Sequence, residues 1–166
     1  MKYKQNYGSI VPMFPTPLGS YDFDIAIESE VLDFIKNDLT YESYHSNRSS
    51  VEGNLLDFPI MREIKEFCEM CLKEYTDTIY DQSFDTTFYI TQSWANITES
   101  NEFHQKHTHP NSIVSGVMYL QTNDNDKIQF LGDPIIYKTV MLNSKSFNDF
   151  NMSFRWFHAC TGKLYL

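Results

Sequence analysis

Apolar residues recur at helical spacing in two stretches of the first half of the chain. Residues 28–39 predict one short amphipathic helix, because the apolar side chains fall three and four positions apart. Residues 59–80 predict a longer helix, with Asp57 and Pro59 as its start signals. Its apolar stripe is wide enough to cover a sheet and comprises Ile60, Ile64, Phe67, Cys68, Cys71, Leu72, Tyr75 and Ile79.

After residue 81 the period changes from helical to alternating, which is typical of β-strands. Prolines in the first twenty residues favour an extended edge strand, or a strap laid over the domain, rather than a helix. Residues 41–56 are polar and contain Gly53, so we expect a long irregular connection there. The alternating segments predict strands at residues 86–97, 113–121, 127–130, 135–142, 154–160 and 163–166.

Two helices followed by a run of short strands predict a mainly β protein with N-terminal helices, of the α+β class. The strands would form a sandwich or a jelly roll, with the helices packed outside it. A length of 166 residues suits a single domain. We expect residues 1–83 to form the strap and two helices, and residues 84–166 to form the jelly-roll strands.

The charge and the lack of long apolar segments limit the expected partners. A net charge of −9 repels the phosphates of nucleic acid and of anionic lipid. No stretch approaches the ~20 apolar residues of a membrane span, and the first residues lack the apolar block of a signal peptide. We therefore expect a cytoplasmic protein that binds neither nucleic acid nor membrane.

Two of the three cysteines, Cys68 and Cys71, form a C-x-x-C sequence inside the longer predicted helix. No second cysteine pair is present, and no strand is expected directly before the pair. Buried cysteines on the helix face are therefore favoured over a redox or zinc site, which remains the alternative.

Three of the five histidines, His104, His107 and His109, lie within six positions. Because side chains two apart on a strand share a face, His107 and His109 are expected to project together from the mouth of a strand, ahead of Pro110. Their imidazoles form a candidate metal site, and ordinary surface histidines are the alternative. His104 lies one turn upstream, and its side chain could point to the opposite face of the strand. The spacing names no metal, since two imidazoles suit Fe, Zn, Cu, Ni and Mn.

The region around these histidines resembles the small 2-oxoglutarate- and Fe(II)-dependent oxygenases of marine bacteria and their phages, which are relatives of the prolyl-4-hydroxylases. The resemblance lies in SWANI, HTHPNSIVSGVMYL and KIQFLGDP, and in the final segment GKLYL. MFPTPL and NRSSVEGNLLDFP are similar to the N-terminal half of the family, so the resemblance covers essentially the whole chain.

The resemblance implies a double-stranded β-helix, a form of jelly roll, that holds Fe(II) and binds the cosubstrates 2-oxoglutarate and O₂. Such sites combine two histidines with one carboxylate, and most relatives have Asp at the position of His109. Here either His107 and His109 are both metal ligands, which we favour, or the carboxylate comes from Asp133. A turn is the alternative role of Asp133.

Asn96, Ser115 and Tyr119 are the candidates for binding the cosubstrate. Each lies in a matching segment, and each has a side chain that can hydrogen-bond to a carboxylate. For Tyr119, packing inside the roll is the alternative, and Trp94 is expected to fill the core. His158 is interpreted as sheet surface, with a substitute metal ligand as the alternative.

The chain ends at Leu166, before the positions at which the family has its distal histidine and the basic residue that binds 2-oxoglutarate. We therefore expect an incomplete jelly roll that lacks its last strands and has little or no turnover. We also expect an unpaired final strand, with which a second copy would pair to give a homodimer through sheet edges.

The expected function is that of a dioxygenase that uses Fe(II) and 2-oxoglutarate to hydroxylate an unknown substrate. A non-catalytic jelly-roll module that binds a metal or another ligand is the alternative. An inactive remnant that binds a partner protein is a third hypothesis.

Overall fold

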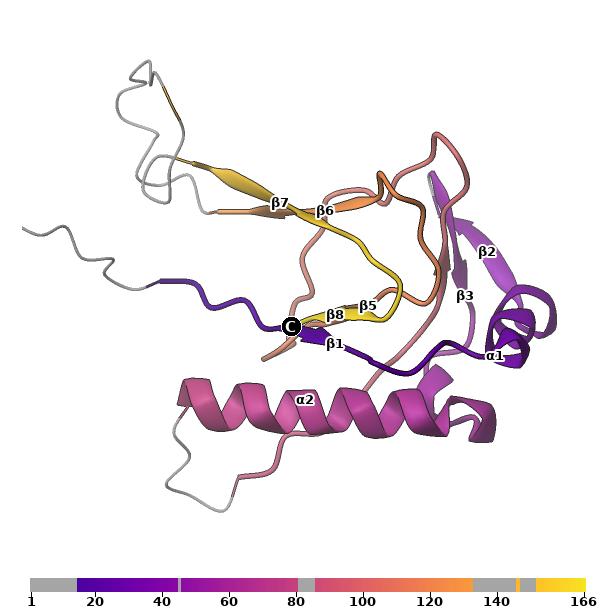
Figure 1. The fold of residues 1–166 in the computed structure, drawn as a ribbon, viewed down its shortest axis with the longest axis horizontal. Helices are drawn as coiled ribbons and strands as arrows, with labels where there is room; N and C mark the ends of the chain where they lie inside the picture. Colours follow the sequence, from indigo (N-terminus) through magenta and orange to yellow (C-terminus); the bar gives the residue numbers. More distant parts are fainter. Residues whose placement is uncertain (1–14, 45, 81–85, 133–145, 147–151) are drawn as a thin grey trace, which may run out of the picture. The chain divides into compact units, whose positions relative to one another are not determined.

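The computed structural model describes residues 15–44, 46–80, 86–132, 146 and 152–166. The chain divides into two compact units (Figure 1). The larger unit consists of Leu18–Asp126 with Ala159–Leu166, and the smaller unit of Met1–Pro17 with Lys127–His158. Each unit is described by itself.

The short helix expected at residues 28–39 is confirmed. It begins as α1 (Ser29–Asp33) and continues as the π-helical turn η1 (Phe34–Asp38). Val31 and Ile35, one turn apart, are its buried side chains.

The long helix expected at residues 59–80 is also confirmed. The 3-10 turns η2 (Leu55–Asp57) and η3 (Pro59–Met61) lead into α2 (Arg62–Tyr80). Pro59 occupies the first helical position, where a missing backbone N–H costs nothing. The buried face is made by Met61, Ile64, Cys68, Cys71, Leu72 and Thr76.

The buried face of α2 differs at its edges from the predicted stripe. Ile60 and Ile79 are 39% and 40% exposed, so they lie outside the buried face. Thr76, which the pattern missed, is buried because its hydroxyl donates to the Leu72 carbonyl at 2.9 Å. A threonine that bonds to the carbonyl four residues earlier leaves no unpaired polar group in the core.

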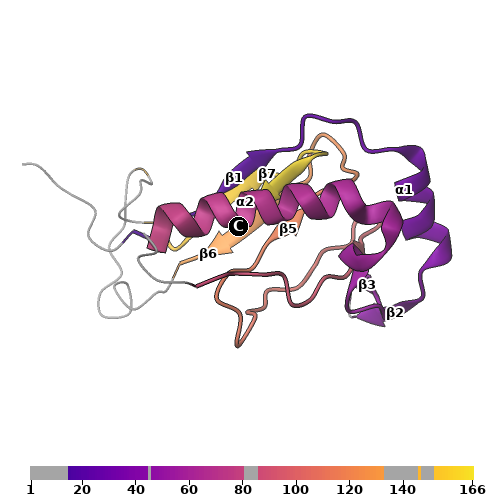
Figure 2. The ribbon, with the colours of Figure 1, turned by 90° about the horizontal axis from the view of Figure 1, so that it is seen from below.

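A three-stranded antiparallel sheet lies against α2 and has the order β1–β8–β5 (Figures 1 and 2). Its strands are β1 (Ser20–Asp22), β8 (Lys163–Tyr165) and β5 (Val117–Met118). Paired bonds between Gly19 and Leu166 extend the β1–β8 ladder by one step. The expectation of an unpaired final strand is wrong, because β8 lies between β1 and β5. The homodimer was expected from that unpaired strand; it stays a prediction without this support.

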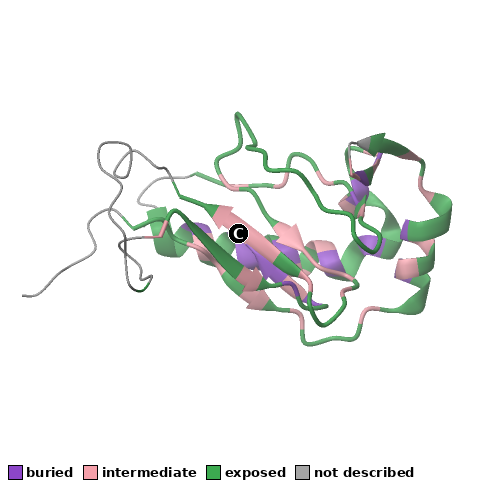
Figure 3. Cartoon of the chain, turned by 90° about the horizontal axis from the view of Figure 1, so that it is seen from above, coloured by how far each residue is buried: buried purple, intermediate pink, exposed green. Residues whose placement is uncertain are grey.

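The core of the larger unit forms where α2 meets this sheet. Leu164 of β8 is 3% exposed and belongs to one cluster with Ile64, Cys68 and Cys71 of α2. Figure 3 shows buried positions gathered around the C-terminal strand. Gly116 lies close to β8: a Cβ there would lie 2.6 Å from the end of the Leu166 side chain, which would have to shift.

The prediction of an irregular connection at residues 41–56 is wrong for the first half of this segment. The segment forms a hairpin of β2 (Tyr41–Tyr44) and β3 (Asn47–Ser50), and β4 (Asn96–Ile97) pairs with β3. The ladder bonds join backbone groups, so polar side chains do not prevent the pairing. The sequence signal was hidden because this hairpin carries few apolar residues.

Two long strands expected from alternation are much shorter in the structure. Of residues 86–97, only β4 at Asn96–Ile97 is a strand, and Ser93 forms an isolated bridge to Asn54. Of residues 113–121, only β5 is a strand. Alternation sets which face a side chain occupies, but a strand also requires a neighbouring backbone.

The smaller unit contains one antiparallel ribbon in its described part. β6 (Lys127–Leu131) pairs along its whole length with β7 (Phe154–His158), which confirms two expected strands. The strand expected at residues 135–142 lies outside the described residues.

The described residues therefore show helices with antiparallel sheets, as expected for the α+β class. The jelly-roll topology and the single domain stay predictions. None of the helices in the described ranges is long and apolar enough to cross a membrane.

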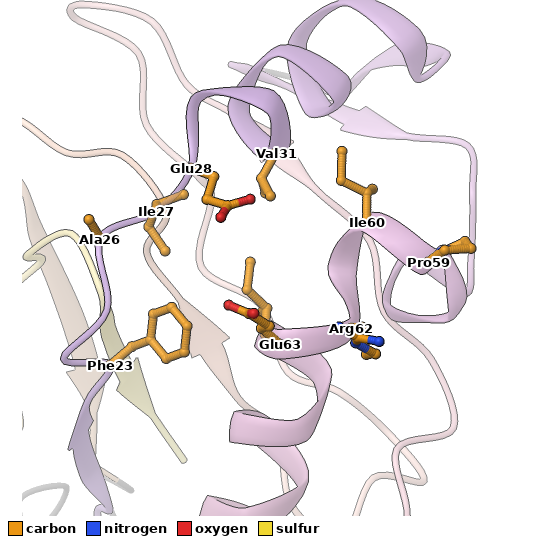
Figure 4. Close-up of a pocket in the computed structure, with 10 residues that line it drawn as sticks. Phe23, Ala26, Ile27, Glu28, Val31, Pro59, Ile60, Arg62 and Glu63 are labelled. Atoms are coloured by element: carbon orange, nitrogen blue, oxygen red, sulfur yellow. The ribbon is translucent and has the colours of Figure 1, made fainter.

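A shallow hollow of about 190 Å³ lies between the start of α1 and the start of α2 (Figure 4). Its lining includes the apolar Phe23, Ile27 and Val31, with the charged side chains of Glu28, Arg62 and Glu63 beside them. Val31 and Ile35 nevertheless belong to one buried cluster with Met61 and Ile64, so the two helices share a core beside the hollow.

Met61, the last residue of the η3 turn that leads into α2, tests the importance of the buried face. Met61→Ala is expected to lower the free energy of unfolding by about 2–5 kcal/mol, because it removes a fully buried side chain and leaves a cavity. Met70→Ala, on the exposed side of the same helix, is the control and should change it by less than about 0.5 kcal/mol. Urea denaturation of both variants measures the difference; equal effects would contradict the placement of Met61.

Candidate metal centre

The histidine segment is held in place without being a strand itself. His104, His107 and His109 lie between β4 and β5, in an exposed stretch of turns and irregular backbone. The prediction that His107 and His109 project from the mouth of a strand is therefore wrong. Asn111, two residues after His109, has a φ of 66°, in the left-handed region that Asn tolerates and that suits a turn.

His107 and His109 nevertheless meet. Their Nε2 atoms lie 3.0 Å apart, and the ring centroids are 4.7 Å apart with an interplanar angle of 79°. Two imidazole nitrogens that bind one ion at ~2.1 Å and at right angles would be ~3.0 Å apart. The spacing thus fits two neighbouring positions of one metal ion. Without an ion, one ring nitrogen can donate a hydrogen bond to the other.

The other nitrogen of His107 selects its tautomer. His107 Nδ1 lies 2.8 Å from the backbone carbonyl oxygen of Gln105, an acceptor, so Nδ1 carries the proton. Nε2 is then unprotonated and presents its lone pair toward His109. Metal-binding histidines commonly donate their second N–H to such a carbonyl, which fixes the orientation of the ring.

His104 lies on the same side as His107, not on the opposite face. The two ring centroids are 4.6 Å apart at an interplanar angle of 68°. His104 Nδ1 is hydrogen-bonded to the amide nitrogen of Asn47, the first residue of β3. Sequence spacing could not reveal this bond, because its partners are 57 positions apart.

Trp94 covers the other end of the histidine row. Its ring centroid lies 5.6 Å from that of His109, and its side chain is 40% exposed, so the expectation that Trp94 fills the core is wrong. Burial, and then the nearby charge of His107, lower the pKa of His109. The pKa of His104 is lowered by burial first and by His107 and His109 next.

The three candidate cosubstrate residues make their described contacts elsewhere. Asn96 accepts a hydrogen bond from the Ser49 hydroxyl at 2.5 Å. The Ser115 hydroxyl donates to Ser112 at 3.1 Å. Tyr119 is partly buried beside Tyr165, with ring centroids 6.5 Å apart, and burial raises its pKa to about 12. Their role toward 2-oxoglutarate stays a prediction.

The third metal ligand is not found among the described residues. Within them, no group of three or more His, Cys, Asp or Glu side chains is placed to hold a metal ion. Asp133 lies outside the described residues. His158 is exposed on β7 of the smaller unit, as expected for sheet surface.

The C-x-x-C pair belongs to the core, as predicted. Cys68 and Cys71 are buried free thiols on α2, and Cys68 contacts the Met118 sulfur at 3.9 Å. Burial, with smaller contributions from neighbouring groups, raises the pKa of Cys68 to about 12 and that of Cys71 to about 11. Thiols with such values are poor nucleophiles and poor metal ligands at neutral pH.

Comparison with known families points to one class of enzyme. Residues 92–166 match the model of a family described as "Putative 2OG-Fe(II) oxygenase". This span contains Trp94 and all three clustered histidines. No curated protein and no solved structure matches the chain. The match suggests an oxygenase; Fe(II), 2-oxoglutarate and O₂ are what the matched family implies, and no substrate is indicated.

The lowered pKa values of His104 and His109 predict how these rings titrate. Both should be neutral at pH 7 and should gain protons only as the pH falls below the ordinary histidine value of 6.5. NMR titration of the imidazole Hε1 signals measures this, with His104→Gln and His109→Gln used to assign the signals. A midpoint above 6.5 for either ring would contradict the lowered pKa.

The burial of the C-x-x-C pair predicts a difference in thiol reactivity. At pH 8, a thiol-specific disulfide reagent should modify the exposed Cys160 quickly and should reach Cys68 and Cys71 only after unfolding. Cys160→Ser should remove the fast phase and leave the slow one. Rapid modification of Cys160→Ser in the folded state would show that the pair is accessible.

Proposed function

We propose that the chain is a 2-oxoglutarate- and Fe(II)-dependent oxygenase that hydroxylates a substrate still to be identified, with His107 and His109 as two of the iron ligands. The observation that carries this proposal is the 3.0 Å approach of the two Nε2 atoms within the span that matches the oxygenase family. That distance suits two adjacent ligands of one ion.

The residues present fit part of an iron site. His107 offers an unprotonated Nε2, held in direction by the Gln105 carbonyl, and His109 is kept neutral at pH 7 by its lowered pKa. Bound iron, with 2-oxoglutarate, would supply the oxygen chemistry that couples decarboxylation of the cosubstrate to hydroxylation. To bind the ion, His109 must move its own proton from Nε2 to Nδ1 if it donates to His107 in the free state.

Other residues are assigned by proposal. Asp133 is the candidate for a carboxylate ligand. Asn96, Ser115 and Tyr119 are the candidates for binding 2-oxoglutarate. With its pKa of about 12, Tyr119 keeps its hydroxyl proton at neutral pH, so it can donate a hydrogen bond to a carboxylate.

A second function is favoured by the number of donors. The described residues bring together two imidazoles, and two donors alone hold a divalent ion weakly. A non-catalytic module that binds a metal or another ligand reversibly would need no more than this pair. The two functions differ in whether bound iron also recruits 2-oxoglutarate.

Anaerobic titration with Fe(II), followed by 2-oxoglutarate, tests the metal site. The chain should bind one Fe(II), and 2-oxoglutarate should then produce a visible charge-transfer absorption. His107→Ala and His109→Ala should each weaken Fe(II) binding by about tenfold or more, since even the loss of a residue that only orients a ligand costs about 10–100-fold. His158→Ala, in the smaller unit, is the control and should bind Fe(II) as the unaltered chain does.

The outcomes separate the two functions. Fe(II) binding that depends on both histidines, without absorption on adding 2-oxoglutarate, would favour the binding module. Unaltered binding in His107→Ala or His109→Ala would show that these imidazoles are not the ligands. No Fe(II) binding at all would contradict the oxygenase and would leave a module that binds another metal or ligand.

A further inference from the structure

Asn47 connects the histidine segment to a sheet. It is the first residue of β3, the central strand of the sheet β2–β3–β4, and only 4% of its surface is exposed. A buried amide requires a hydrogen-bond partner, because burying it unpaired is unfavourable. The described partner of the Asn47 amide nitrogen is Nδ1 of His104.

This bond determines the tautomer of His104. The side-chain amide nitrogen of Asn47, Nδ2, is a donor, so Nδ1 of His104 must accept the hydrogen bond and must be unprotonated. A neutral imidazole has one ring proton, which therefore sits on Nε2. With Nδ1 occupied by Asn47 and Nε2 carrying the proton, neither nitrogen of His104 has a lone pair available for a metal ion.

The tautomer of His104 is the opposite of that of His107. The backbone carbonyl oxygen of Gln105 accepts a hydrogen bond from Nδ1 of His107, whereas the side-chain amide of Asn47 donates a hydrogen bond to Nδ1 of His104. Two adjacent imidazoles are thus given different roles by the atoms bonded to Nδ1.

The ring of His104 also supports the ring of His107. The two rings meet edge to face, with centroids 4.6 Å apart. All residues from His104 to Asn111 are exposed, and none lies in a helix or strand, so their backbone has little other restraint. Asn47 supplies that restraint from a buried position in a sheet.

We propose that Asn47 and His104 form a positioning pair for the metal site: Asn47 holds His104 as its Nε2–H tautomer, which excludes His104 from the ion and fixes its ring against His107. The proposal rests on the proposed function for the identity of the metal ligands. His104 is a positioning residue rather than a ligand, and His107 and His109 bind the ion.

The tautomers are tested first, on the metal-free chain with unaltered sequence. Long-range ¹H–¹⁵N correlation spectra at pH 7.5 distinguish a protonated from an unprotonated ring nitrogen. We expect the proton on Nε2 in His104 and on Nδ1 in His107. Asn47→Asp offers only acceptor oxygens, so it should move the proton of His104 to Nδ1. A proton on Nδ1 of His104 in the unaltered chain would overturn the proposal.

Binding of Co(II) then tests the positioning role. Asn47→Leu and His104→Phe should each weaken Co(II) binding by about 10–100-fold, the range for residues that orient metal ligands. Because the two residues act through one bond, the double variant should bind no more weakly than either single variant. Ser49→Ala removes a different side-chain hydrogen bond made by β3, the one to Asn96 of β4, and is the matched control, with unchanged binding expected. Calorimetry gives the affinities, and thermal unfolding monitors the fold.

Failure of this inference is distinguishable from failure of the proposed function. If the unaltered chain binds no Co(II), the proposed function fails, and the tautomer spectra still decide whether Asn47 controls His104. If Co(II) binds and depends on His107 but not on Asn47 or His104, the positioning pair alone is overturned. Losses that add in the double variant would also overturn it, because two independent effects add.

Discussion

The contact of α2 with the sheet β1–β8–β5 is the interaction on which the larger unit depends. The buried side chains Ile64, Cys68 and Cys71 of the helix pack with Leu164 of β8. β8 in turn pairs with β1 on one side and with β5 on the other. Segments from opposite parts of the sequence thus meet under one helix, and the apolar area they bury offsets the entropy of closing so long a loop.

This frame sets the ends of the segment that carries the histidines. β5 joins the main sheet a few residues after His109, and β4 joins the second sheet before His104. Between these anchors the backbone is irregular, as is common where a rigid scaffold presents functional side chains. The hydrogen bond of Asn47 and the ring contact of Trp94 then tie the row of imidazoles to the scaffold at both ends.

Hydrogen bonds to Nδ1 make the neighbouring imidazoles chemically different. His107 donates to a carbonyl and presents a lone pair, whereas His104 accepts from an amide and does not. The number of metal ligands in such a cluster therefore depends on the hydrogen-bond partner of each Nδ1 atom as well as on the number of imidazole rings. In a site with few donors, this pre-organisation matters more, because a weakly held ion cannot itself order the segment.

The sequence alone determined the two helices, the strands β6, β7 and β8, and the burial of Cys68 and Cys71. These features depend on local period and spacing, which the order of residues contains directly. The hairpin β2–β3, the shortness of β4 and β5, the exposure of Trp94 and the bond from Asn47 to His104 were decided by tertiary structure. Each of them depends on which distant backbone or side chain lies alongside, and periodicity carries no record of such partners.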